Sequence, residues 1–142
     1  MPQREKTALD ILEGARRLLL PRYRWTKGKA VRLITEEGER PAYCYCLDGA
    51  VRRAAGSRIY KSIRGDGEVV VCLDATPRLN EEALGRAQAV LDMVVRRNPE
   101  RKRAYPPAIA PPRVSFNDAD PTNHEDILSV VEEAIQEEKE SA

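Results

Sequence analysis

Four stretches of this sequence carry apolar residues at every third or fourth position, and this spacing constrains the fold more than any other feature. It gives an α-helix one continuous apolar face, which must be buried against another element. In the first stretch, Thr7 and Asp10 have the spacing of a capping box, and Pro21 ends the helix. Helices are therefore expected near residues 7–20, 41–55, 80–97 and 123–138.

Short runs between these helices are rich in β-branched residues, which is typical of buried strands. Strands are expected near residues 31–35, 69–73 and 113–117. A chain of 142 residues has the usual length of one domain. The sequence therefore predicts a single α+β domain over residues 1–142, with about four helices packed around two or three short strands.

Two segments are expected to pack less firmly than the rest of the domain. Residues 98–113 hold five of the ten prolines together with several basic residues, which favours a semi-extended connector. Residues 137–142 form an acidic end that is expected to fray beyond the last helix.

The net charge of +1 conceals a strong asymmetry along the chain. Residues 1–113 hold 23 of the 24 Lys and Arg residues, whereas residues 114–142 hold nine of the 23 Asp and Glu residues and one Lys. In the favoured interpretation, the acidic last helix packs on the basic body and neutralises it. In the other, the body binds an acidic partner and the acidic end competes for that surface.

The sequence favours a cytoplasmic protein that does not enter a membrane. No apolar run approaches the roughly 20 residues that a membrane-spanning helix needs. The first residues, MPQREKTALDILEG, lack the apolar stretch and cleavage site of a signal peptide. Three cysteines are too few, and odd in number, for a disulfide framework.

Two cysteines lie close together in the sequence AYCYCLDGAVRRAAG, which begins at Ala42. Under the helical prediction, Cys46 points into the core and Cys44 lies about 200° around the helix from it. Neighbouring cysteines of one helix then cannot bind one metal ion. A zinc site of Cys44, Cys46, Cys72 and His124 also lacks the usual ligand spacing, so no metal and no cofactor are predicted.

A cysteine-dependent hydrolase is one possible function. Its nucleophile would be Cys46, its base His124, and its orienting group Asp118 or Asn117. The helical prediction places Cys46 about five residues into its helix, whereas reactive thiolates favour a helix N-terminus and partial exposure. An inert core cysteine is therefore preferred, and catalysis is the less favoured class of function.

A nucleic-acid-binding protein is a second alternative, based on the basic segment 21–29. Arg22, Arg24 and Lys29 could neutralise phosphates, and Trp25 could stack on a base. The competing interpretation is that Trp25, the only tryptophan, anchors the core. The sequence pI of about 7.7 is below the usual value for nucleic-acid-binding domains.

Three short patterns resemble a small family of unknown function that occurs in actinobacteria and their phages. They are Trp25 with Gly28, the Cys-Leu-x-Gly-Ala sequence that begins at Cys46, and the Asn117–Asp118 pair before the last helix. The resemblance implies a small cytoplasmic accessory protein, encoded by a phage or mobile element, and no reaction. Candidate ligand-binding residues are Trp25, Lys27, Asn117 and Asp118.

The expected function is therefore that of an accessory binding protein that acts through a protein partner or a small ligand. The nucleic-acid binder and the cysteine-dependent hydrolase remain as alternatives. The oligomeric state is left open.

Overall fold

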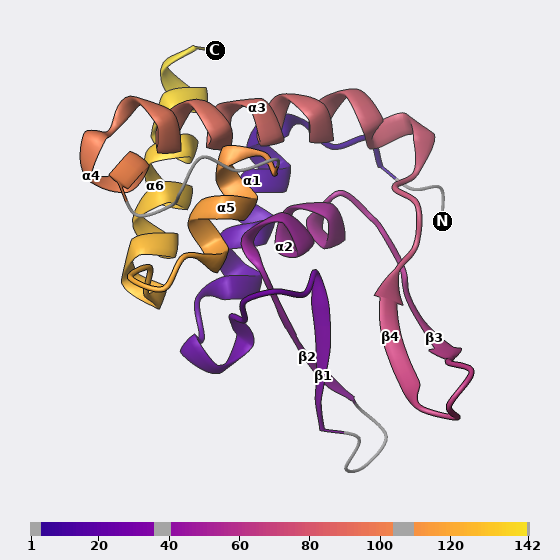
Figure 1. The fold of residues 1–142 in the computed structure, drawn as a ribbon. Coiled ribbons are helices and arrows are strands. Elements are labelled where there is room, and N and C mark those ends of the chain that lie inside the picture. Colours follow the sequence, from indigo (N-terminus) through magenta and orange to yellow (C-terminus); the bar gives the residue numbers. More distant parts are fainter. Residues whose placement is uncertain (1–3, 36–40, 104–109, 142) are drawn as a thin grey trace.

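The computed structural model describes residues 4–35, 41–103 and 110–141. Within these residues the chain forms six α-helices, two 3-10 turns and two separate two-stranded sheets (Figure 1), which makes it an α+β protein. In chain order the elements are α1 (Ala8–Leu19), η1 (Arg22–Arg24), β1 (Val31–Thr35), β2 (Ala42–Tyr45), α2 (Leu47–Ala54), β3 (Ile59–Ile63), β4 (Val69–Leu73), η2 (Arg78–Asn80), α3 (Glu81–Arg97), α4 (Pro99–Arg103), α5 (Pro112–Asp118) and α6 (His124–Glu140).

The core lies among α1, α2, α3 and α6, whose apolar faces meet in one cluster. The predicted capping box of α1 is present, since the Thr7 hydroxyl and the Asp10 carboxylate each accept a hydrogen bond from the other residue's backbone. The helical periodicity therefore identified the elements that build the core. The largest fully buried side chains include Ile11, Leu12, Leu19, Leu47, Leu91 and Ile127.

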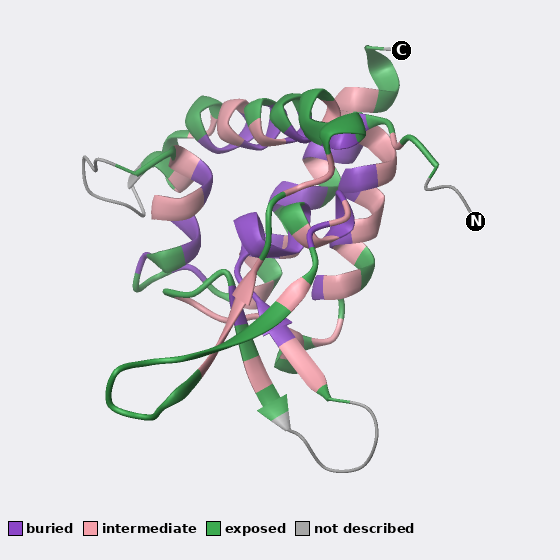
Figure 2. Cartoon of the chain, turned by 90° about the vertical axis from the view of Figure 1, so that its right-hand side faces the viewer, coloured by how far each residue is buried: buried purple, intermediate pink, exposed green. Residues whose placement is uncertain are grey.

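Two β-hairpins project from the helical body on the same side (Figures 1 and 2). β1 pairs antiparallel with β2, and β3 pairs antiparallel with β4. The strands predicted near residues 31–35 and 69–73 are confirmed as β1 and β4. The β3–β4 hairpin is mostly exposed, and the side chain of Ile63 near its tip is 76% exposed.

The prediction of one helix over residues 41–55 is wrong in its first part. Ala42–Tyr45 forms strand β2, and the helix begins only at Leu47 with Cys46 as its N-cap. Pro41 precedes a strand here, where a residue without an N–H group is also tolerated. Both cysteines therefore have extended backbone or a cap position, and the helical angle between them does not apply.

The prediction of a strand near residues 113–117 is also wrong, because Pro112–Asp118 forms helix α5. Its buried residues are Arg113, Phe116 and Asn117, which have the spacing of one helical face. Pro112 occupies the first turn, where its missing N–H costs nothing. The sequence alone did not reveal this face because one of its members is an arginine.

The expected connector contains helical residues at both of its ends. Pro99–Arg103 forms α4 and residue 112 begins α5, so an extended backbone is wrong for these parts. Residues 104–109 of the connector lie outside the described residues.

The acidic C-terminal segment packs against the basic body, as the favoured interpretation predicted. α6 contacts α1 and α3, and its glutamates form ion pairs with arginines of α1, α3 and α4. α6 continues to Glu140, two residues beyond the expected end of the last helix, and the fraying expected at residues 137–142 stays a prediction. The pairs are Glu132 with Arg16, Glu133 with Arg97 and Arg101, Glu137 with Arg97, and Glu138 with Arg86.

In the described part of the chain, no helix is both long enough and apolar enough to cross a lipid bilayer.

Candidate functional site

A pocket of about 830 Å³ lies where α1, η1 and the end of α2 come together. We call it the basic pocket, because six cationic residues line it and only two acidic ones, Asp10 and Glu13. Sequence analysis named one of these cations, Arg24, and missed the others because they come from four separate segments. The six are Arg4, Lys6, Arg17, Arg24, Arg53 and Arg58.

The two acids leave most of the positive charge of the basic pocket uncompensated. The Asp10 carboxylate already accepts the hydrogen bond from the Thr7 amide, which lowers the pKa of Asp10. Lys6 Nζ donates to the carbonyl of Ala54, and Arg53 donates to the carbonyl of Ser57 at 2.8 Å. Because carbonyls are neutral, these bonds orient the cations without cancelling their charge.

Four arginines of the basic pocket make no ion pair with any carboxylate that the structure describes. They are Arg4, Arg17, Arg24 and Arg58. Within the described residues, Arg24 Nε is also buried without a hydrogen-bond partner. A buried donor without an acceptor is rare in folded proteins, so this atom calls for an explanation.

The predicted ligand-binding residues meet in a second place, around the amide of Asn117. Its oxygen accepts from the Trp25 indole at 2.7 Å and from the backbone N–H of Leu47 at 3.0 Å. Its nitrogen donates to the carbonyl of Thr26 and to Asp118. The side chain of Asn117 is 1% exposed, so it joins η1, α2 and α5 from inside the protein.

Asp118 and Lys27 complete this Asn117 cluster from the surface. The Asp118 carboxylate accepts from the amide of Gly28 at 2.8 Å. Gly28 has a φ of +81°, a left-handed conformation that favours glycine. Lys27 Nζ donates to the carbonyl of Ala119 at 2.6 Å. Asn117 and Asp118 are the last two residues of α5, and a turn follows them.

Cys46 lies beside the Asn117 cluster as the N-cap of α2. Its sulfur accepts the hydrogen bond of the Gly49 amide at 3.2 Å. Burial raises the pKa of the Cys46 thiol to about 11, although the Gly49 amide opposes the rise. The expected position inside a helix is wrong, yet Cys46 is buried as predicted, and its thiol is protonated at neutral pH.

His124 does not meet Cys46 in a hydrogen bond. Its Nε2 lies 2.7 Å from the carbonyl of Leu19, so this nitrogen carries the proton and donates it. Its ring lies 6.2 Å from that of Trp25. No group of three or more His, Cys, Asp or Glu residues in the described part of the chain could hold a metal ion.

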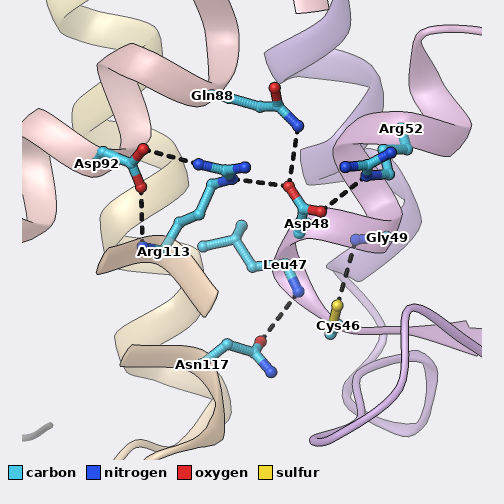
Figure 3. A network of polar contacts seen from close by, with 9 residues as sticks. All are labelled: Cys46, Leu47, Asp48, Gly49, Arg52, Gln88, Asp92, Arg113 and Asn117. Carbon is cyan, nitrogen blue, oxygen red and sulfur yellow. Dashed lines mark hydrogen bonds and ion pairs between the residues drawn. The ribbon is translucent and has the colours of Figure 1, made fainter. Parts of the chain in front are cut away.

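An ion-pair network that sequence analysis missed joins α2, α3 and α5 (Figure 3). Asp48 accepts from Arg113 at 2.7 Å, from Arg52 at 2.8 Å and from Gln88 at 3.1 Å. Arg113 also binds Asp92 through its side chain and its backbone amide. Burial would raise the pKa of Asp48, but the hydrogen bonds from Arg113 and Arg52 outweigh it, and the pKa is lowered.

The glycine of the second motif permits a close backbone approach. A Cβ atom at Gly49 would lie 1.7 Å from the carbonyl oxygen of Ala30. The contact is therefore with the segment just before β1. All three motifs thus contribute to one junction between η1, α2 and α5.

Comparison with known protein families shows which family this chain belongs to. A family model described as a family of unknown function, DUF6197, matches residues 3–137. The chain belongs to the DUF6197 family. No curated protein and no solved structure gives a significant match.

For this DUF6197 chain, the recognised motif residues have structural partners in the described structure. Trp25, Gly28, Asn117 and Asp118 hold one another and the start of α2. The basic pocket differs, because it combines free volume with four arginines that make no ion pair with a described carboxylate. Of the predicted nucleic-acid-binding residues, Arg24 lines the basic pocket, whereas Arg22 and Lys29 are exposed outside its lining.

Proposed function

We propose that this protein is a non-enzymatic binding protein whose ligand is an anion held in the basic pocket. The observation that carries the proposal is the charge of the lining, six cations against two acids. Walls of one charge sign concentrate field lines and raise the local concentration of a counter-charged ligand.

The size of the basic pocket supports a small ligand. Its volume of about 830 Å³ lies within the roughly 300–1,000 Å³ of sites for small molecules. Arginine is suited to such a site, since its planar guanidinium binds carboxylate or phosphate through two parallel hydrogen bonds.

The Cys46 hydrolase has less support. Its thiol is buried and protonated, and its hydrogen bond comes from Gly49 rather than from a base. The proposed accessory role, the cytoplasmic location and the phage or mobile-element origin stay predictions.

A nucleic acid is the second candidate ligand, because an exposed aromatic ring lies next to the basic pocket. Tyr23 is 65% exposed, and the guanidinium carbon of Arg24 lies 5.9 Å from its ring centroid. A base could stack on this ring while a phosphate meets Arg24.

Calorimetric titration with two small polyanions, inorganic triphosphate and citrate, tests the proposed function. The wild type is compared with Arg58→Gln, which removes a cation from the basic pocket, and with Arg96→Gln. Arg96 is the matched control, because it is exposed on α3 and makes no ion pair with a described carboxylate.

We expect at least one of the two anions to bind, with Arg58→Gln weakening it by about threefold or more and Arg96→Gln leaving it unchanged. Binding of neither anion, or equal weakening by both variants, would overturn the proposed function.

A further inference from the structure

A second cavity lies between the two β-hairpins and shares no lining residue with the basic pocket. Its volume is about 500 Å³, with β1 on one side and β4 on the other. The two hairpins diverge toward their tips (Figure 2). We call this cavity the hairpin groove. Its apolar lining consists of Val31, Leu33, Val69, Val70 and Val71.

The strand edges beside the hairpin groove have no strand partner in the described structure. β1 pairs only with β2 and β4 only with β3, and no hydrogen bond joins β1 to β4. The amide of Arg64 donates to the carbonyl of Glu68 at 2.8 Å, which makes these two residues a hydrogen-bonded pair. Such pairs alternate with non-hydrogen-bonded pairs along an antiparallel ladder. The backbone groups of Val69 and Val71 therefore point away from β3, toward the free edge of β4.

β4 lacks the features that usually protect a free edge. Native proteins place a charged residue, a proline or a β-bulge at such an edge to prevent pairing with another chain. The sequence of β4 is Val-Val-Val-Cys-Leu, and its register with β3 is regular over all five residues. β1 differs, because its register shifts between Leu33 and Thr35. The edge of β4 is therefore the better template for an additional strand.

The charges of the hairpin groove indicate which kind of strand it accepts. Lys29 and Arg32 line the groove, together with Lys61. Neither Lys29 nor Arg32 makes an ion pair with a carboxylate that the structure describes. Glu68 is the acidic residue in this lining, and its charge is compensated by Arg64 at 3.3 Å. The groove thus combines an apolar lining with exposed cations.

We propose that the hairpin groove binds an extended, acidic segment of another protein, which adds to the free edge of β4. Backbone hydrogen bonds to Val69 and Val71 provide affinity in this mode of recognition. Successive side chains of a strand point to opposite faces, so apolar side chains at alternate positions contact the lining. The acidic side chains of the segment lie near Lys29 and Arg32.

A second copy of this chain fits the hairpin groove less well than an acidic segment. Pairing of two β4 edges would bring Lys29 and Arg32 of both copies to the same interface. Like charges placed together at an interface oppose association.

Selection of random dodecapeptides displayed on phage tests the proposal without assuming the sequence of the partner. The target is the full-length protein, and counter-selection uses the double variant Lys29→Glu, Arg32→Glu. We expect enriched peptides to have a net negative charge and apolar residues at alternate positions. The proposal is overturned if no peptide is enriched over the counter-selection, or if the enriched peptides are basic.

The most enriched peptide is then labelled with fluorescein and titrated against single variants. Arg32→Glu should weaken its binding by about fivefold. Arg22→Glu is the matched control, because Arg22 is an exposed cation outside the groove. Val69→Thr should weaken binding by about threefold, since it replaces an apolar methyl group, whereas Leu79→Thr, on an exposed residue elsewhere, should not. A thermal melt verifies that each variant is folded, and if the double variant is not, Arg32→Glu serves for counter-selection.

Further measurements separate the hairpin groove from the basic pocket and from a dimer interface. The backbone amides of Val69 and Val71 should exchange more slowly with solvent when the peptide is bound, and Arg58→Gln should leave the peptide affinity unchanged. Unchanged exchange at both valines, or weakening by Arg58→Gln but not by Arg32→Glu, would contradict the proposal. So would a dimer in sedimentation that Val69→Thr dissociates, because a second copy would then occupy the groove. Each of these results leaves anion binding in the basic pocket intact.

Discussion

At the scale of single residues, Gly49 lies where the protein has no room for a side chain. A Cβ atom there would lie 1.7 Å from the Ala30 carbonyl oxygen. A backbone carbonyl cannot move aside as the end of a flexible side chain can. The need for glycine therefore arises from a neighbour about twenty residues earlier in the chain.

Replacing Gly49 by alanine should destabilise the protein by at least about 3 kcal/mol, the upper end of the cost of overpacking. Gly85→Ala is the matched control, because Gly85 lies in α3 and a Cβ there meets no atom within 4 Å. That variant should gain about 0.5–1 kcal/mol from helix propensity. Urea unfolding measures the free energy of unfolding of both variants. A Gly49→Ala variant as stable as the wild type would refute the close contact.

The thiols give a second test at the residue scale. Cys44 and Cys46 are buried, and burial raises the pKa of both, whereas Cys72 is partly exposed. Since the thiolate is the reactive form, a thiol reagent at pH 7 should label Cys72 in the native protein and the other two only after unfolding. Mass spectrometry of labelled peptides identifies the sites. Rapid labelling of Cys46 in the native state would revive the hydrolase hypothesis.

At the scale of elements, the Asp48 network explains how α5 docks against α2 and α3. Because its hydrogen bonds lower the pKa of Asp48 in the folded state, the unfolded chain takes up a proton first as the pH falls. The stability that Asp48 contributes is therefore present above its ordinary pKa of 3.8 and is lost as the pH falls through the lowered value.

Replacing Asp48 by asparagine should cost about 3 kcal/mol at pH 7, because it breaks a buried ion pair. The variant should also lose less stability than the wild type between about pH 5 and pH 3, since it has no carboxylate to protonate. Asp120→Asn, on an exposed residue, is the control and should follow the wild type. If the free energy of unfolding falls equally steeply between about pH 5 and pH 3 in Asp48→Asn and in the wild type, the lowered pKa of Asp48 is contradicted.

Some of these elements could be predicted from the sequence and others could not. Helices α1, α3 and α6 were predictable because their apolar periodicity and their end signals agree. The pattern from Tyr43 to Ala54 fits a helix as well, but pairing of β2 with β1 supplies backbone partners that no local pattern reveals. α5 was missed because its inward face includes Arg113, whose partners Asp48 and Asp92 are distant in sequence.

At the scale of the whole molecule, the charge asymmetry of the sequence is resolved into two surfaces. The glutamates of α6 cover arginines of α1, α3 and α4, whereas the basic pocket keeps its positive charge. The packing of α6 on the basic residues was predictable from the sequence, because the acidic residues are concentrated in the last segment and the basic residues in the rest of the chain. The second was not, because residues from 4 to 58 meet in the basic pocket through the packing of α1 on α2.

The most direct test of anion binding in the basic pocket is an NMR titration of the ¹⁵N-labelled protein with inorganic triphosphate. We expect the largest shifts at backbone amides of Lys6, Gly14, Arg53 and Gly56, and at the Nε–H signal of Arg24. Amides of the β3–β4 hairpin and of the Asn117 cluster should stay unchanged. No shifts, or shifts concentrated on the hairpin or the Asn117 cluster, would contradict the assignment of the basic pocket as the ligand site.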